Sequence, residues 1–278
     1  MGKSKGAPPA GQKAPNTGLV GPISGEVVNL DSDKVDVVIR AAAALSLVAQ
    51  RDDCPPEITD AAPKLVLVLS SASDLIVQRN CAAALTSIMS ASEAGWRRVV
   101  ESGAAAALVA TLGKAEDGPL LVNCCESLGV LSTLGDEGTE AAVAAGGVDA
   151  VCAQLGKAEE AGVAEAVADV VCALAASETV RPRLVAAGAV EGLGGLLGSG
   201  SPEVTVRALL GLGMVLGSSQ EAQLKLAALP GAVGRLVQLM RSDDGDAKVV
   251  ASGLFAGLAK NEGCRTAVEA ALRGAADG

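Results

Sequence analysis

The sequence predicts an all-α fold made of repeated helical units, and three observations support this prediction. Half of the 278 residues are apolar but only 1% are aromatic, so the core must be packed from Ala, Val and Leu, which suit closely packed helices. The pentapeptide LGKAE occurs at 112–116 and again at 155–159. Glycines also recur every 42 or 43 residues, a spacing typical of a solenoid repeat.

Each predicted unit begins with a short helix that ends at a marker glycine, where a left-handed residue is expected. A second helix of about ten residues follows, because the residues two, five and nine positions after each marker are apolar and share one helix face. The marker glycines are Gly103, Gly146, Gly188 and Gly231, and an earlier copy carries Asp60 at this place.

A longer third helix follows a polar loop in each unit, with apolar residues repeated at helical spacing. Its predicted core residues in the first four units are Ala42, Leu45, Val48, Ala82, Leu85, Ile88, Cys125, Leu128, Leu131, Ala168, Val171 and Leu174. For the last two units the register predicts Leu210, Gly213 and Leu216, and then, after a one-residue slip, Ser252, Phe255 and Leu258.

The domain organisation follows from this register. We predict a disordered basic N-terminal tail over residues 1–22, a repeat body over 23–273 and a C-terminal tail over 274–278. The predicted units are 23–54, 55–95, 96–138, 139–180, 181–222 and 223–264, followed by a partial cap over 265–273.

The three-helix unit, with a second helix that opens on the pattern G-A-V-x-x-L-V-x-L-L, resembles the armadillo repeat. HEAT repeats have a similar period but two helices, so the short first helix and the glycine favour the armadillo type. The resemblance covers roughly residues 23–273 and implies a right-handed α-solenoid of about six repeats. It also implies a concave face, lined by the third helices, on which partners bind.

Nine residues are predicted to lie on this concave face, opposite the core residues of the third helices. They are Arg40, Arg79, Asn80, Asn123, Glu126, Glu165, Asp169, Arg207 and Lys248. Along the chain these residues are first basic, then polar, then acidic, and then basic again, so a partner segment with the complementary order of charges can bind them. The alternative is that they form an ordinary solvated helix face that binds no partner. We expect charge reversal at Arg79 and Arg207 to weaken binding without lowering the melting temperature.

Two known modes of armadillo binding are not expected. The importin alpha branch carries a repeated Trp and a repeated Asn on its third helices, and neither is present here. The positions that match the Trp are Ala43, Ala83, Glu126, Asp169 and Gly211. The positions that match the Asn are Leu47, Ser87, Val130, Ala173 and Val215. The long basic groove of the β-catenin branch is interrupted by Glu165 and Asp169.

The composition argues against catalysis and against a metal site. The chain contains no histidine, which excludes Ser-His-Asp and Cys-His nucleophiles and His-ligated zinc. Its seven cysteines form no C-x-x-C pair, and neither Gly-Lys pair lies in a phosphate-binding loop. We therefore expect no enzyme activity, no catalytic residue and no cofactor.

The net charge of −10 argues against a nucleic-acid-binding protein. The longest uncharged stretches have 13 residues, too few for a membrane span, so we expect no membrane insertion and a cytoplasmic location. The basic tail carries Lys3, Lys5 and Lys13, which either touch an acidic partner surface or are merely solvated.

Two further residues have alternative interpretations. Trp96 is expected to open the first helix of its unit, and it either packs as a staple on the preceding repeat or anchors a partner. Cys124 stands next to a core position and is either a buried thiol or an exposed, reactive one.

These interpretations together favour a non-enzymatic scaffold or adaptor that binds proteins. Short intracellular armadillo proteins of this kind resemble components of cilia and flagella, so the resemblance implies a place in an axoneme or another microtubule-based assembly. The alternative is a soluble adaptor in trafficking or ubiquitin ligation.

Overall fold

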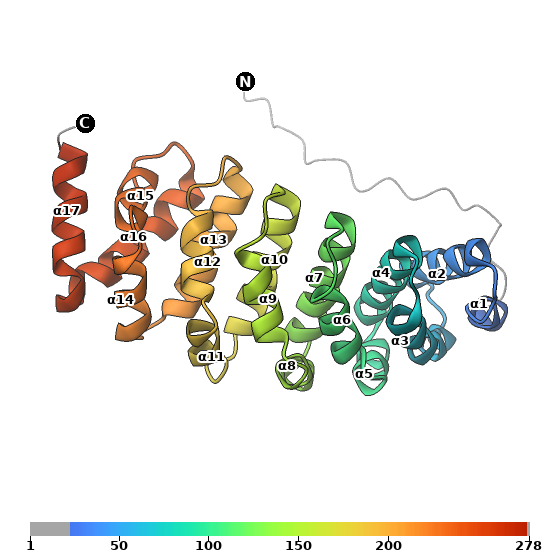
Figure 1. The fold of residues 1–278 in the computed structure, drawn as a ribbon. Helices are drawn as coiled ribbons and strands as arrows, with labels where there is room; N and C mark the ends of the chain where they lie inside the picture. Colours follow the sequence, from blue (N-terminus) through green and yellow to red (C-terminus); the bar gives the residue numbers. More distant parts are fainter. Residues whose placement is uncertain (1–22, 277–278) are drawn as a thin grey trace, which may run out of the picture.

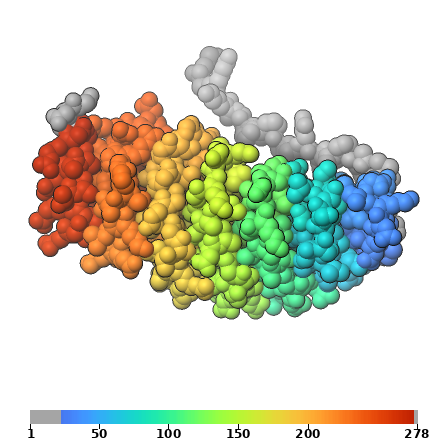
Figure 2. Space-filling view, in the orientation of Figure 1, coloured from blue at the N-terminus to red at the C-terminus, as the bar shows by residue number. Residues whose placement is uncertain are grey.

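The computed structural model describes residues 23–276, and over this range the chain consists of seventeen α-helices, two short 3-10 helices and connecting loops. The units follow one another in chain order along an elongated body, from α1 (Ile23–Asn29) to α17 (Arg265–Ala276) (Figures 1 and 2). The predicted all-α solenoid is thereby confirmed.

Each complete unit contributes one helix to each of three rows. The first helices are η1 (Pro56–Ala61), α5 (Glu93–Glu101), α8 (Asp136–Ala144), α11 (Arg181–Ala186) and α14 (Gln220–Ala228). The second helices are α3 (Ala62–Ser71), α6 (Ala104–Leu112), α9 (Gly147–Leu155), α12 (Ala189–Leu196) and α15 (Ala232–Leu239). The third helices are α2 (Val35–Ala49), α4 (Leu75–Ala91), α7 (Gly118–Thr133), α10 (Ala161–Ala175), α13 (Pro202–Leu216) and α16 (Gly245–Lys260), and consecutive third helices contact each other.

The marker glycines have the backbone conformation that the sequence predicts. Gly103, Gly146, Gly188 and Gly231 have φ values of 78°, 84°, 90° and 75°, and each precedes the first residue of a second helix. The earlier copy has Asp60 instead, and there the first helix is the 3-10 helix η1, which runs directly into α3. The left-handed backbone conformation between the first and second helices thus occurs in the units that have glycine there, because glycine has no Cβ to make this conformation costly.

The first helices begin earlier than the sequence predicts. Ser92 caps α5 by accepting a hydrogen bond from the Gly95 amide at 3.0 Å, so Trp96 is the fourth residue of the helix and does not open it. α8 begins at Asp136, before the predicted unit boundary at 138/139. The final helix α17 extends to Ala276 and packs on α15, so residues 274–276 belong to a helix.

The predicted core register is only partly right in the last two third helices, where Leu216 and Leu258 are buried as predicted but the other four residues are not. Leu210 is 38% exposed, whereas the neighbouring Leu209 and Leu212 are buried. The reason is that α13 begins at Pro202, only 41 residues after α10 begins at Ala161. In α16 the residues Ser252 and Phe255 are half-buried, and the buried face is formed by Ala247, Ala251 and Leu258.

The predicted basic tail, with Lys3, Lys5 and Lys13, lies outside the described residues. Between Ile23 and Ala276, every helix is too short or too polar to cross a bilayer.

Candidate partner-binding groove

A groove on the row of third helices brings together four of the nine predicted site residues. This α7–α10 groove has a volume of about 900 Å³ and is lined by α7 and α10, with further side chains from α4 and α13. Glu126, Glu165, Asp169 and Arg207 line it. Its other lining is mainly apolar and small, and includes Val122, Gly129, Val130, Gly162, Ala166, Ala173 and Met214.

The charged residues of the groove form one cluster with an excess of negative charge. The Arg207 Nε lies 3.2 Å from Asp169 Oδ1 and 3.8 Å from Glu165 Oε1. Partial burial raises the pKa of Asp169, and the neighbouring Glu165 carboxylate raises it further, while Arg207 acts in the opposite direction. Glu126 is exposed on α7. The groove lining therefore carries three carboxylates and one guanidinium, and two of the carboxylates lie close to that guanidinium.

Arg79, in contrast, holds two repeats together. Its guanidinium makes two hydrogen bonds to Asp117, with the Nε at 2.7 Å from Oδ1. Asp117 also caps α7 by accepting a hydrogen bond from the Leu120 amide at 2.9 Å. The Arg79 hydrogen bond is the main cause that lowers the pKa of Asp117. Charge reversal at Arg79 is therefore expected to lower the melting temperature, in contrast to the expectation from the sequence.

Asn80 and Asn123 are engaged in the same inter-repeat bonding. The Asn80 amide donates to the Ile39 carbonyl at 3.2 Å, and the Asn123 amide donates to the Arg79 carbonyl at 3.0 Å. The two asparagines occupy equivalent positions of consecutive repeats, 43 residues apart. Each therefore bonds its helix to the preceding third helix.

The remaining two predicted site residues lie away from the groove. Arg40 pairs with Asp36 of its own helix at 3.2 Å, and both side chains are 73% exposed, so this pair contributes little to stability. Lys248 is exposed on α16. The structure thus gathers four of the nine residues into one site and distributes the other five along the layer.

The cysteines are not activated. Cys124 is fully buried, and burial raises its pKa to about 12, so the exposed and reactive interpretation is wrong. Cys172 faces the groove, but burial and the nearby Asp169 raise its pKa to about 11. Both thiols are protonated at neutral pH and are poor nucleophiles.

Trp96 is a core residue. Only 5% of it is exposed, and its indole N–H donates to the Leu131 carbonyl in α7 at 3.0 Å. This bond joins the first and third helices of one repeat, and α5 also contacts η1, α3 and α4 of the preceding repeat, so the burial of Trp96 agrees with the packing interpretation. A buried indole cannot anchor a partner.

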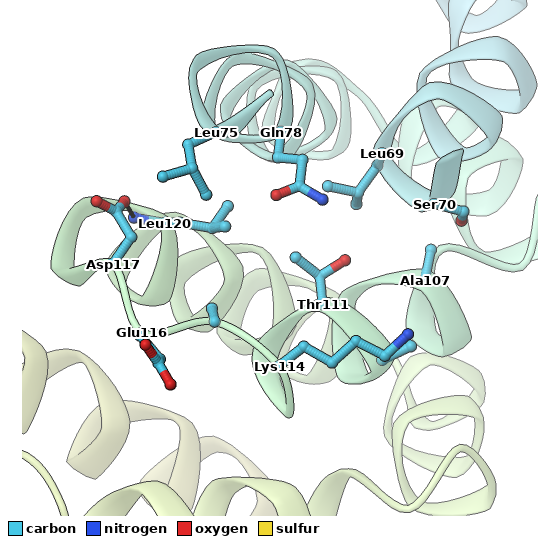
Figure 3. Close-up of a pocket in the computed structure, with 12 residues that line it drawn as sticks. Leu69, Ser70, Leu75, Gln78, Ala107, Thr111, Lys114, Glu116, Asp117 and Leu120 are labelled. Atoms are coloured by element: carbon cyan, nitrogen blue, oxygen red, sulfur yellow. Dashed lines mark hydrogen bonds between the residues drawn. The ribbon is translucent and has the colours of Figure 1, made fainter. Parts of the chain in front are cut away.

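A second, smaller cavity of about 340 Å³ lies where α3 and α4 meet α6 and α7. Figure 3 shows Leu69, Leu75 and Leu120 around it, with Gln78 and Thr111 between them. Its Gln78 amide already donates to the Ala72 carbonyl at 2.9 Å, and the rim residue Asp117 is paired with Arg79. Its other two charged residues, Lys114 and Glu116, have opposite signs, so with Asp117 paired the cavity has no excess of negative charge.

The described residues also contain no cluster of three or more His, Cys, Asp or Glu side chains that could hold a metal ion.

Comparison with known proteins identifies the class of fold. No family model and no curated protein sequence matches the chain. Among solved structures, an engineered protein matches with a TM-score of 0.75 at 22% identity, covering 85% of this chain and 98% of the other. Computationally designed armadillo repeat proteins for modular peptide recognition match with a TM-score of 0.74 at 21% identity, covering 85% and 99%. A designed armadillo repeat protein in complex with the peptide (KR)4 matches with a TM-score of 0.73 at the same identity and the same coverage of both chains.

At these identities the likeness establishes the fold alone. Together with the three rows of helices and the marker glycines, it defines this chain as an armadillo-type α-solenoid.

Proposed function

We propose that this protein is a non-enzymatic protein-interaction scaffold, and that the α7–α10 groove receives a basic segment of its partner. The observation that carries the proposal is the charge of the groove, whose lining holds the carboxylates of Glu126, Glu165 and Asp169 and a single cation, Arg207. The designed armadillo protein that matches this fold is in complex with a basic peptide, which supports the same class of ligand.

The electrostatics of the groove favour a cationic ligand for a simple reason. Asp169 is partly desolvated, and its pKa is raised although Arg207 lies 3.2 Å away. A second cation near Glu165 and Asp169 would therefore complete the neutralisation of the site. Carboxylates that are partly screened from water also attract a cation more strongly than fully exposed ones.

The test is a titration of a fluorescein-labelled (KR)4 peptide into the full chain, followed by fluorescence anisotropy. The double variant Glu165→Gln/Asp169→Asn should weaken binding by about tenfold or more, which corresponds to roughly 1.4 kcal/mol. The matched control Glu101→Gln/Glu140→Gln removes the same charge from the exposed first helices α5 and α8. Equal weakening by both pairs would mean that only net charge matters and that the groove is not the site.

The cellular setting is a separate part of the proposal. The family resemblance supports a cytoplasmic scaffold in a cilium, a flagellar axoneme or another microtubule-based assembly, in which the basic N-terminal tail could contact an acidic surface. The alternative is an adaptor in trafficking or ubiquitin ligation. A pull-down of the tagged chain from native extract, with the groove double variant as control, separates the two. Axonemal proteins lost in the variant favour the first, and ligase or coat subunits favour the second.

A further inference from the structure

We infer that the α7–α10 groove binds its partner as an amphipathic helix with basic residues along one flank, and not as an extended peptide. This inference rests on the proposed function, because it names the conformation of the segment that the groove receives. Three features of the groove carry it: its direction, its hydrogen-bonding groups and the placement of its charges.

The groove runs along the axes of its two main helices. Its lining residues on α7 extend from Val122 to Thr133, and those on α10 extend from Gly162 to Ala176 at the end of the helix. Within each set the residues recur every three or four positions, so each set forms one face over three or four turns. At 1.5 Å per residue these faces are about 16–21 Å long, which matches a helix of about 11–14 residues. A trough between two helices is the site into which a third helix packs.

The hydrogen-bonding groups of the groove do not suit an extended backbone. An extended segment brings unpaired N–H and C=O groups, and burying them without partners is costly. No Asn or Gln side chain lines the groove in the described structure. Asn80 and Asn123, which lie on the same row of helices, instead donate hydrogen bonds to carbonyl groups of the preceding third helices. The hydroxyl of Thr86 is bonded to Ser127. A helix satisfies its own backbone groups and needs only side-chain contacts.

The charges are placed to select the side chains of such a helix. Glu165 and Asp169 are four residues apart on α10, so their carboxylates lie one turn apart along the groove. Lys or Arg residues at the same spacing on a bound helix can reach both. The lining also contains apolar, half-buried side chains, among them Val130 on α7 and Met214 on α13, and these accept the Leu or Met side chains of the opposite flank.

The experiment compares two labelled peptides of identical composition, built from Leu, Lys and Ala. In the first, Leu and Lys are spaced to form two flanks of a helix of about 14 residues. In the second they alternate, as in a strand. Both are titrated into the full chain, with (KR)4 as a third probe, and carbonyl isotope labels report the backbone conformation of each peptide by infrared spectroscopy. We expect the helix-patterned peptide to bind at least about tenfold more tightly than the alternating one and to become helical when bound.

A groove-filling variant shows where the peptides bind. Gly129 lies inside α7, lines the groove and has nothing within 4 Å of an added Cβ. Gly129→Leu should therefore retain the fold while its side chain occupies the groove, and it should weaken binding by more than about tenfold. The matched control is Gly195→Leu, since Gly195 is exposed on the second-row helix α12 and also has nothing within 4 Å of an added Cβ.

The outcomes distinguish this inference from the proposed function. If the alternating peptide or (KR)4 binds in the groove and the helix-patterned peptide does not, the helical mode is overturned while the groove remains a binding site for basic segments. If Gly129→Leu and Gly195→Leu leave the binding of all three peptides unchanged, the groove is not the site and both proposals fail.

Discussion

The substitution Gly138→Ala should destabilise this protein, although replacing glycine inside a helix normally does the reverse. Gly138 is the buried third residue of α8, and an added Cβ would overlap the carbonyl oxygen of Leu131 in α7. The oxygen is a backbone atom and the backbone fixes the position of the Cβ, so no side-chain rotation relieves the overlap. The Leu131 carbonyl also accepts the indole N–H of Trp96 at 3.0 Å, which opposes its displacement.

The magnitude follows from three contributions. Overpacking a tight contact costs about 1–3 kcal/mol, and weakening the Trp96 hydrogen bond adds up to about 1 kcal/mol. The gain in helix propensity from glycine to alanine offsets about 0.5–1 kcal/mol of this. With each contribution at the middle of its range, the net loss in the free energy of unfolding is about 2 kcal/mol. Gly129→Ala provides the matched control, because its Cβ meets nothing within 4 Å and only the propensity gain of about 0.5–1 kcal/mol remains.

The assay is urea unfolding followed by far-ultraviolet circular dichroism, with the fluorescence of Trp96, the only tryptophan, as a local reporter. Gly138→Ala should lower the midpoint and shift the Trp96 emission, and Gly129→Ala should raise the midpoint with the emission unchanged. If Gly138→Ala raised the midpoint as Gly129→Ala does, the close approach of α8 to α7 would not exist and the reasoning would be refuted.

Three further predictions concern single side chains. Trp96→Phe should lower the free energy of unfolding by about 1–3 kcal/mol in the same assay, because it leaves the buried Leu131 carbonyl without its donor; an unchanged midpoint would contradict this. Arg79→Glu should lower the melting temperature, because it places a carboxylate beside Asp117, and should leave peptide binding in the groove intact; the converse result would restore Arg79 as a binding residue. The pKa of Asp169, followed by carboxyl carbon NMR, should lie above its ordinary value. Because the folded state then binds its proton more tightly, the Asp169 contribution to stability should increase as the pH falls through this pKa, and Asp169→Asn should remove that dependence; titration at or below the ordinary value would contradict it.

The fold was predictable because the sequence repeat determines both the spacing between equivalent helices and the face of each helix that is buried. Gly103 and the three other marker glycines follow from their period, and their positive φ values agree with that prediction. The same 43-residue period relates Gly95 to Gly138, yet their role was not predicted. A glycine needed for close approach between helices looks the same in sequence as one that ends a helix, and only the position of the neighbouring carbonyl distinguishes them.

The site was predictable only in part. The repeat register predicts on which face of a helix a side chain lies, but not which side chain of the neighbouring helix it contacts. Glu165, Asp169 and Arg207 were expected on one face, and the structure brings them into contact. Arg79 was expected on the same face, but Asp117 lies opposite it at the start of the next third helix. The sequence Asp117-Gly118-Pro119 does contain a signal, since an Asp followed by a proline within the next two residues is typical of an N-cap and the first turn of a helix.

The position of the groove follows from how the third helices bond to one another. Between α2 and α4, and again between α4 and α7, side chains form hydrogen bonds across the interface, such as Ser46 with Ser87 at 2.9 Å and Thr86 with Ser127 at 2.7 Å. The position of Asn123 is taken by Ala166 in α10, and in the described structure no side-chain hydrogen bond joins α7 to α10. From α10 onward the row instead carries charged side chains, and Glu165 and Asp169 on α10 lie close to Arg207 on α13. The N-terminal repeats thus use their polar groups to hold the layer together, and the first interface without such bonds, between α7 and α10, is the one that the groove follows.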